Sequence, residues 1–280
     1  MSKKWIKTIT INNGMGGQFG LLALYWQVIG ALTEGREMYV DYRAPECCYS
    51  DPADPGRNVW ELYFKQPYGK TIEQIDDELR AGTFGPHIRD GFTSYHFIHF
   101  LQGNKIFDHP KMPVIRDWVR RVEIRDEIVA KADTFYNANM EDHKILGIQK
   151  RGTDHYTVGH GRGGRIDINA IFALADGRMS SGGYEKIFLV TDEAPTLRIF
   201  KDRYKGRLIH YDDAILSETE MAIHQDPKNK GTKIGEDVLV EAILLSRCDY
   251  LLVPASNIAL YAVIKGGIPF YKFDGHITYR

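Results

Sequence analysis

Arg151 follows an apolar, strand-like segment at residues 144–149 and is followed at once by Gly152 and Asp154. A guanidinium at the end of a strand can hold a diphosphate through two parallel hydrogen bonds. It can also stabilise the negative charge that develops on a diphosphate leaving group. The alternative is a surface cation paired to Asp154. The apolar strand and the glycine-rich stretch 159–164 favour the diphosphate-binding interpretation.

Three further polar residues follow Arg151 and are grouped with it as catalytic candidates. Asp154 comes three residues later, and His155 and His160 lie within the next six. Histidine is the most frequent side chain that accepts a proton from a reacting hydroxyl. His155 and His160 are therefore the best candidates for a general base, and exposed loop histidines are an equally good explanation of both.

Residues 12–20 form a glycine-rich loop between a strand-like segment, 5–11, and a strongly apolar segment, 21–32. Glycines let backbone amides approach a phosphate or a sugar, and the start of the next helix favours anions. A tight turn would explain these glycines equally well. The dinucleotide-binding pattern G-x-G-x-x-G fails here, because Phe19 stands where the third glycine belongs.

A second buried strand, 187–190, ends in Thr191 and Asp192. A hydroxyl and a carboxylate at this point can bind a ribose. They can equally cap the helix that follows, because short polar side chains accept hydrogen bonds from the free amides of a helix start.

Three more candidates lie near the end of the chain. Glu241 interrupts an apolar helical stretch, and a lone buried acid is costly unless it has a partner such as a ribose hydroxyl. A Glu241 side chain that reaches solvent or pairs with a nearby cation is an equally good explanation. Ser256 and Asn257 begin a helix directly after a strand, where a phosphate can bind. A plain N-cap explains Ser256 as well.

Hydrophobic periodicity gives the elements that must position these residues. Strands alternate with helices, so the sequence predicts a mostly parallel sheet with right-handed crossovers. We expect an α/β protein with two α/β units, at residues 1–115 and 116–280. The N-terminal unit is expected to contain a strand at 37–41, a helical stretch is expected at 114–134, and the C-terminal strands are expected at 144–149, 187–190, 208–211, 250–253 and 270–273.

Composition excludes several classes of function. The 280 residues carry a net charge of −1, so no basic field predicts nucleic-acid binding. Three cysteines without a C-x-x-C spacing indicate neither a disulfide framework nor a zinc site. The sequence contains no stretch of about 18 apolar residues, so no membrane span is predicted. A cytoplasmic location is expected, or the host cytoplasm for a viral protein.

Taken together, these motifs resemble the fucosyltransferase superfamily, which includes protein O-fucosyltransferases, α1,6-fucosyltransferases and the nodulation fucosyltransferase. Residues 12–20 resemble the G-x-G-N-Q loop of that family. Residues 151–154 resemble its H-V-R-R-T-D or H-R-G-T-D segment, and 188–192 its Y-L-A-T-D strand. Residues 244–257 resemble its L-S-x-A-D-x-L-V…S-S element. The order and spacing match over about residues 8–275.

The resemblance implies a GT-B-like fold, in which two Rossmann-like units face a central cleft, and an inverting glycosyltransferase. It places Arg151 on the β-phosphate of a nucleotide-sugar donor, Ser256 and Asn257 on the phosphates, and Glu241 on the nucleotide. The N-terminal unit, with Gly16, Gly17 and Gln18, would face the acceptor and the sugar. The acceptor would be a glycan or glycoprotein, as in glycan-building enzymes of bacteria or large DNA viruses.

No metal or other cofactor is expected, because the chain has no D-x-D triplet and Arg151 can supply the positive charge. Three departures from the family pattern leave the donor open between GDP-fucose and UDP-xylose or another UDP-sugar. Gly17 replaces an Asn, Gln149 a His, and Gly152 a second Arg. Two other classes remain as alternatives. One is a nicotinamide-dependent oxidoreductase built on residues 14–20, with Asp41 on a ribose. The other is a non-catalytic glycan-binding protein that uses the aromatic residues around 95–100 as its platform.

Overall fold

The computed structural model describes residues 21–43 (without 34, 36 and 37), 47–82, 108–152 and 167–273 (without 227). The strand expected at 5–11 and the glycine-rich loop 12–20 lie outside these ranges. Both parts of the chain that the sequence treats as separate units are represented, so the elements around the predicted site can be traced.

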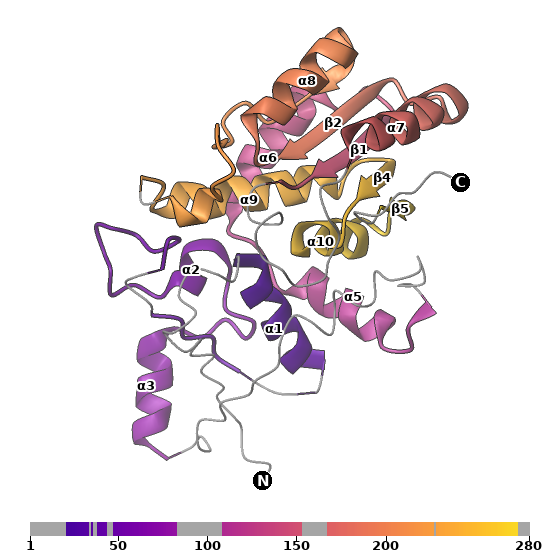
Figure 1. Cartoon of the computed structure of the whole chain (residues 1–280). Coiled ribbons are helices and arrows are strands. Elements are labelled where there is room, and N and C mark those ends of the chain that lie inside the picture. Colours follow the sequence, from indigo (N-terminus) through magenta and orange to yellow (C-terminus); the bar gives the residue numbers. More distant parts are fainter. Residues whose placement is uncertain are drawn as a thin grey trace.

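A five-stranded sheet in the order β3-β2-β1-β4-β5 organises the C-terminal half (Figure 1). Every strand pairs in parallel with its neighbour. The strand order runs outward from β1 on one side and then restarts with β4 on the other. Ligands of open parallel sheets bind where the order reverses, beyond the carboxyl ends of the strands. The strands are β1 (Ile145–Lys150), β2 (Lys186–Thr191), β3 (Leu208–Ile209), β4 (Tyr250–Val253) and β5 (Phe270–Lys272).

Alternate residues of the strands face two different layers of helices, as the period of two in a strand requires. Leu146, Ile148 and Leu252 belong to one core with residues of α7 (Ile168–Gly182) and α8 (Ala194–Tyr204). Leu251 and Val253 belong to another with residues of α6 (Asp126–Asn139), α9 (Thr232–Leu245) and α10 (Asn257–Gly266). The sheet is therefore covered on both faces (Figure 1).

Helix α9 approaches β1 closely because Gly147 has no side chain. A Cβ at this position would lie 2.6 Å from Leu251 Cδ2 and 2.9 Å from Leu245 Cδ1. The glycine is thus required by the space between the sheet and the C-terminal end of α9.

Helix α1 (Leu21–Thr33) is the central element of the N-terminal half. It is apolar on every side and almost wholly buried, as expected of a core helix. It packs against α5 (Met112–Arg121) and against α10 of the C-terminal half. The ring centroids of Tyr25 and Tyr261 are 5.6 Å apart, and Trp26 Nε1 donates to the Asn257 carbonyl at 3.2 Å. One hydrophobic core therefore runs through both halves.

The segment expected as a strand at 37–41 belongs to no strand where it is described, residues 38–41, and has no ladder partner there. Two side-chain amides take the partner's place. Gln66 Oε1 accepts from Val40 N at 3.0 Å, and Asn58 Nδ2 donates to the Val40 carbonyl at 2.7 Å. Asn58 Oδ1 also accepts from Tyr42 N and caps α2 (Val59–Tyr63).

The helical stretch expected at 114–134 is wrong as a single element, because it divides into α5 and α6. Residues 122–125 leave the helix to pair with the end of α2. Lys65 N donates to the Glu123 carbonyl and Arg125 N to the Tyr63 carbonyl, each at 2.9 Å. The domain boundary predicted between residues 115 and 116 falls inside α5 and stays a prediction.

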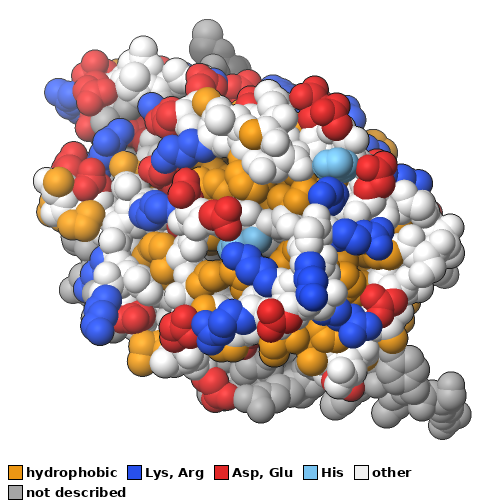
Figure 2. All heavy atoms as spheres, turned by 90° about the horizontal axis from the view of Figure 1, so that it is seen from above, with side chains coloured by type: hydrophobic (Ala, Val, Ile, Leu, Met, Phe, Trp, Pro, Cys, Tyr) orange, Lys and Arg blue, Asp and Glu red, His pale blue; other side chains and the backbone are white. Residues whose placement is uncertain are grey.

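Another helix of this region, α3 (Ile72–Arg80), is short and mostly polar. On the face shown in Figure 2, acidic and basic side chains are interspersed with hydrophobic ones. Within the described part of the chain, the helices are all too short or too polar to cross a bilayer.

Candidate active site

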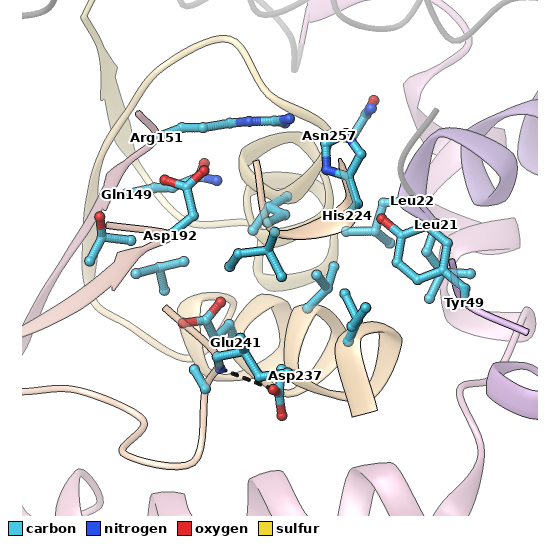
Figure 3. Close-up of a pocket in the computed structure, with 18 of the residues that line it drawn as sticks. Leu21, Leu22, Tyr49, Gln149, Arg151, Asp192, His224, Asp237, Glu241 and Asn257 are labelled. Carbon is cyan, nitrogen blue, oxygen red and sulfur yellow. Dashed lines mark hydrogen bonds between the residues drawn. The ribbon is translucent and has the colours of Figure 1, made fainter. Parts of the chain in front are cut away.

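A cavity of about 190 Å³ lies at the carboxyl ends of β1, β2 and β4 (Figure 3). This is the edge of the sheet at which the strand order reverses. Five of the predicted site residues line it, and they come from four separate elements or loops: Arg151, Thr191, Asp192, Glu241 and Asn257. The sequence prediction that these remote residues share one place is therefore consistent with the structure.

The end of β1 sends its side chains in two directions. Gln149 and Arg151 alternate with Lys150, whose ammonium forms a buried ion pair with Glu193. Thr196 Oγ1 also donates to the Glu193 carboxylate, at 2.6 Å. Arg151 extends across the top of the cavity in Figure 3. The residue beside Arg151 is thus anchored to the neighbouring strand end.

Thr191 and Asp192 fix this strand end rather than cap the next helix. Asp192 Oδ1 accepts from Gly152 N at 2.9 Å, and Thr191 Oγ1 accepts from Glu193 N at 3.3 Å. Glu193 is the N-cap residue of α8, and its side chain makes no capping bond there. Asp192 therefore holds the backbone just after Arg151 and borders the cavity at the same time.

Glu241 is buried, and its Oε1 has no hydrogen-bond partner among the described residues. Burial raises the pKa of this carboxyl well above its usual range, and the nearby charges of Asp237 and Asp192 raise it further. A neutral carboxyl both donates and accepts hydrogen bonds. Its side chain points into the cavity in Figure 3. Buried polar atoms are rarely left unsatisfied, so Glu241 Oε1 is available to a polar group that enters the cavity.

Asp237, one turn earlier on α9, is satisfied by the protein itself. It pairs with Lys233, and its Oδ2 accepts from Ile215 N at 3.2 Å. Burial nevertheless raises the pKa of Asp237. Asp237 therefore anchors a loop, whereas Glu241 Oε1 lacks a partner among the described residues.

Ser256 and Asn257 differ in the same way. Ser256 Oγ donates to Gln149 Oε1 at 2.6 Å and accepts from Ala259 N at 3.0 Å, so it caps α10 and ties this helix to β1. Asn257 Oδ1 is buried at the cavity and has no partner within the described chain. The phosphate contact predicted for Ser256 stays a prediction, and Asn257 is the better placed of the two.

The sequence analysis did not predict the opposite wall of the cavity. This wall consists of Tyr49 and the first turn of α1, with His224 contributed by a short 3₁₀ turn, Ile223–Gln225. Tyr49 comes from a segment that the sequence reads only as irregular. The apolar helix after a glycine-rich loop was the one signal for this wall.

Six predicted residues lie outside the described residues: Gly16, Gly17, Gln18, Asp154, His155 and His160. Their roles stay predictions. Asp41, which an oxidoreductase would use on a ribose, pairs with Arg43 at 2.9 Å and does not line the cavity. Within the described ranges, no cluster of three His, Cys, Asp or Glu residues is arranged to hold a metal ion.

Neither a protein-family model nor a curated protein sequence matches this chain. Solved structures do. NodZ α1,6-fucosyltransferase co-crystallized with GDP matches with a TM-score of 0.58 at 18% identity, over 99% of this chain and 98% of that chain. NodZ from Bradyrhizobium gives the same TM-score, identity and coverage.

The chain shares its fold with NodZ. A NodZ crystal soaked with GDP-fucose also matches, with a TM-score of 0.55 at 16% identity over 99% of this chain and 98% of that chain. The similarity confirms the expected α/β fold with its parallel sheet. It extends over nearly the whole length of both proteins. The expected division into two Rossmann-like units that face a central cleft stays a prediction.

Proposed function

We propose that this protein is a glycosyltransferase that moves a sugar from a nucleotide-diphosphate donor to a hydroxyl of a glycan or glycoprotein. The observation that carries the proposal is the cavity where the strand order reverses. There, Arg151 borders the same space as the unpartnered acceptors of Glu241 and Asn257. The shared fold with NodZ, which has been crystallised with GDP, supports it.

In this reaction the bond between the sugar's anomeric carbon and the β-phosphate oxygen breaks, and its electron pair stays on the diphosphate. The acceptor oxygen forms the new bond from the opposite face, so the configuration inverts, and its proton passes to a general base. Arg151 would stabilise the departing diphosphate through charge-assisted hydrogen bonds. Asp154, His155 and His160 remain the proposed catalytic partners, with either histidine as the base. No metal is required in this scheme, because Arg151 supplies the cation.

Glu241 and Asn257 would contact the nucleotide part of the donor. A neutral Glu241 carboxyl can donate to one ribose hydroxyl and accept from another. GDP-fucose is the first candidate donor, because NodZ has been soaked with it. UDP-xylose or another UDP-sugar remains the alternative. The proposed location is the cytoplasm.

The test is thermal unfolding with GDP, UDP or NAD in a buffer that contains EDTA. A nucleotide at about 100 times its dissociation constant should stabilise the protein by roughly 2.7 kcal/mol. We expect this with GDP or UDP, and we expect Arg151→Ala to lose it. Arg80→Ala is the control, because Arg80 is exposed on α3, where it contacts Asp77 and the Asp76 carbonyl.

Two results would contradict the proposal. Stabilisation by NAD alone would favour the oxidoreductase. No response to any nucleotide, either in EDTA or with added Mg²⁺ or Mn²⁺, would favour a non-catalytic glycan-binding protein. A response to GDP or UDP that appears only with the added metal would leave the transferase but overturn metal independence.

A further inference from the structure

Tyr49 faces Arg151 from the opposite wall of the cavity. Both residues line it, and the Arg151 charge acts on the Tyr49 phenol. In Figure 3 the phenol oxygen of Tyr49 points into the open space from the N-terminal side, while Arg151 extends from the end of β1. Tyr49 is the polar residue that the described N-terminal half contributes to this cavity.

The hydroxyl of Tyr49 has a proton to donate. The backbone amide of Leu21 bonds to the phenol oxygen as a donor, so this contact uses a lone pair and leaves the hydroxyl hydrogen. Burial raises the pKa of Tyr49 above its ordinary value, which keeps the phenol protonated at neutral pH. A buried neutral phenol that faces a cavity is a hydrogen-bond donor for whatever binds there.

The position of this phenol is fixed by contacts with the start of α9. Tyr63 Oη donates to the Tyr49 carbonyl at 2.7 Å and is also 3.3 Å from the Thr232 carbonyl. Gly231 N donates to the Cys48 carbonyl at 2.9 Å. Gly235 leaves room for the Tyr63 ring, since a Cβ there would lie 2.4 Å from that ring. The loop that carries Tyr49 is therefore held in place before any donor binds.

We propose that Tyr49 donates a hydrogen bond to the same diphosphate group that Arg151 holds, and is a catalytic residue of the transfer. This inference rests on the proposed function. As the bond to the sugar breaks, negative charge grows on the diphosphate oxygen. A hydrogen-bond donor held in a fixed position therefore stabilises the transition state more than the ground state. Arg151 and Tyr49 would hold the leaving group from two sides.

The experiment compares nucleoside diphosphates with monophosphates. Isothermal titration of wild type and Tyr49→Phe would use GDP and GMP, and UDP and UMP. A hydrogen bond to a charged group corresponds to roughly a tenfold or larger change in affinity. We expect Tyr49→Phe to weaken binding of the preferred diphosphate about tenfold and to leave binding of its monophosphate unchanged.

Tyr25→Phe is the matched control, because its buried hydroxyl bonds to the Val119 carbonyl at 3.3 Å, away from the cavity. It should bind the diphosphate as wild type does. The double variant of Tyr49→Phe with Arg151→Ala should show non-additive losses, because both groups contact one diphosphate. The rate at which the nucleotide-sugar donor is hydrolysed, measured as release of the nucleotide, should fall in Tyr49→Phe even at saturating donor.

The outcomes separate this inference from the proposed function. If wild type binds neither GDP nor UDP, the transferase proposal fails, and the role of Tyr49 fails with it. If wild type binds one of them and Tyr49→Phe binds it equally well, only the role of Tyr49 is overturned. An equal loss for diphosphate and monophosphate would also overturn it, since Tyr49 would then contact the nucleoside.

Discussion

The backbone of Gly152 lies directly against the carboxylate of Glu193. A Cβ at residue 152 would be only 1.8 Å from Glu193 Cδ. This carboxylate cannot move aside easily, because it forms a buried ion pair with Lys150 and accepts from Thr196. The glycine that follows Arg151 is therefore required by its neighbour, and the two strand ends fit together only without a side chain there.

Gly152→Ala should displace either Glu193 or the backbone that carries Arg151. We expect a loss of about 1–3 kcal/mol in the free energy of unfolding, typical of an overpacked site. Nucleotide affinity should fall as well, because Arg151 moves with this backbone. Urea denaturation and titration with GDP or UDP measure the two effects.

Gly177→Ala is the control for Gly152→Ala. Gly177 lies inside α7, and a Cβ there would meet no atom within 4 Å. This exchange should raise stability by roughly 0.5–1 kcal/mol, because alanine is the better helix former. Wild-type nucleotide binding in Gly152→Ala would show that the Gly152–Glu193 contact does not position Arg151.

Glu241→Gln tests the neutral state of the buried carboxyl. In wild type the folded-state pKa of Glu241 is raised above its usual value of 4.5, so the folded protein holds a proton that the unfolded chain loses above that pH. Stability from this group is therefore present at low pH and declines as pH rises. The glutamine variant lacks this decline.

Unfolding in urea at pH 5, 6.5 and 8 measures the effect. We expect the stability of Glu241→Gln relative to wild type to increase across this series. Equal differences at all three pH values would mean that the carboxylate is ionised in the folded protein. Nucleotide binding by the variant is a separate measurement, because an amide keeps a donor and an acceptor.

Ser256→Ala separates the capping role of Ser256 from a phosphate contact. Loss of an N-cap costs about 0.5–2 kcal/mol, and here Gln149 loses its partner too. We expect lower stability and a smaller loss of nucleotide affinity than in Arg151→Ala. Asp167→Ala, which removes the cap of α7, is the control. A loss of affinity as large as in Arg151→Ala would assign Ser256 to the phosphates.

The C-terminal half was predictable from sequence because its strands are buried on both faces and its site residues follow them directly. The run 187–190 leads straight into Thr191 and Asp192, and the run 250–253 is followed after two residues by Ser256 and Asn257. A residue just beyond a parallel strand has its position set by the sheet. Arg151, Asp192 and Asn257 could therefore be placed together without knowledge of tertiary contacts.

The N-terminal contributions could not be predicted in this way. The hydrogen bonds of Val40 come from Asn58 and Gln66, whose side chains carry no periodic signal. Tyr49 reaches the cavity through contacts with Tyr63 and with residues beyond 230. The break between α5 and α6 likewise depends on pairing with Tyr63 and Lys65. In each case, the determining partner is remote in sequence.

The hydrophobic core that joins α1 to α10 has a consequence for how the protein denatures. Trp26 is fully buried in that core and also bonds to the carbonyl of Asn257, a residue of the cavity. Heating cannot release α1 without exposing α10 and removing one wall of the cavity. The two halves should therefore melt in a single cooperative transition, and the fluorescence of Trp26 should report the loss of the donor site together with the loss of the fold.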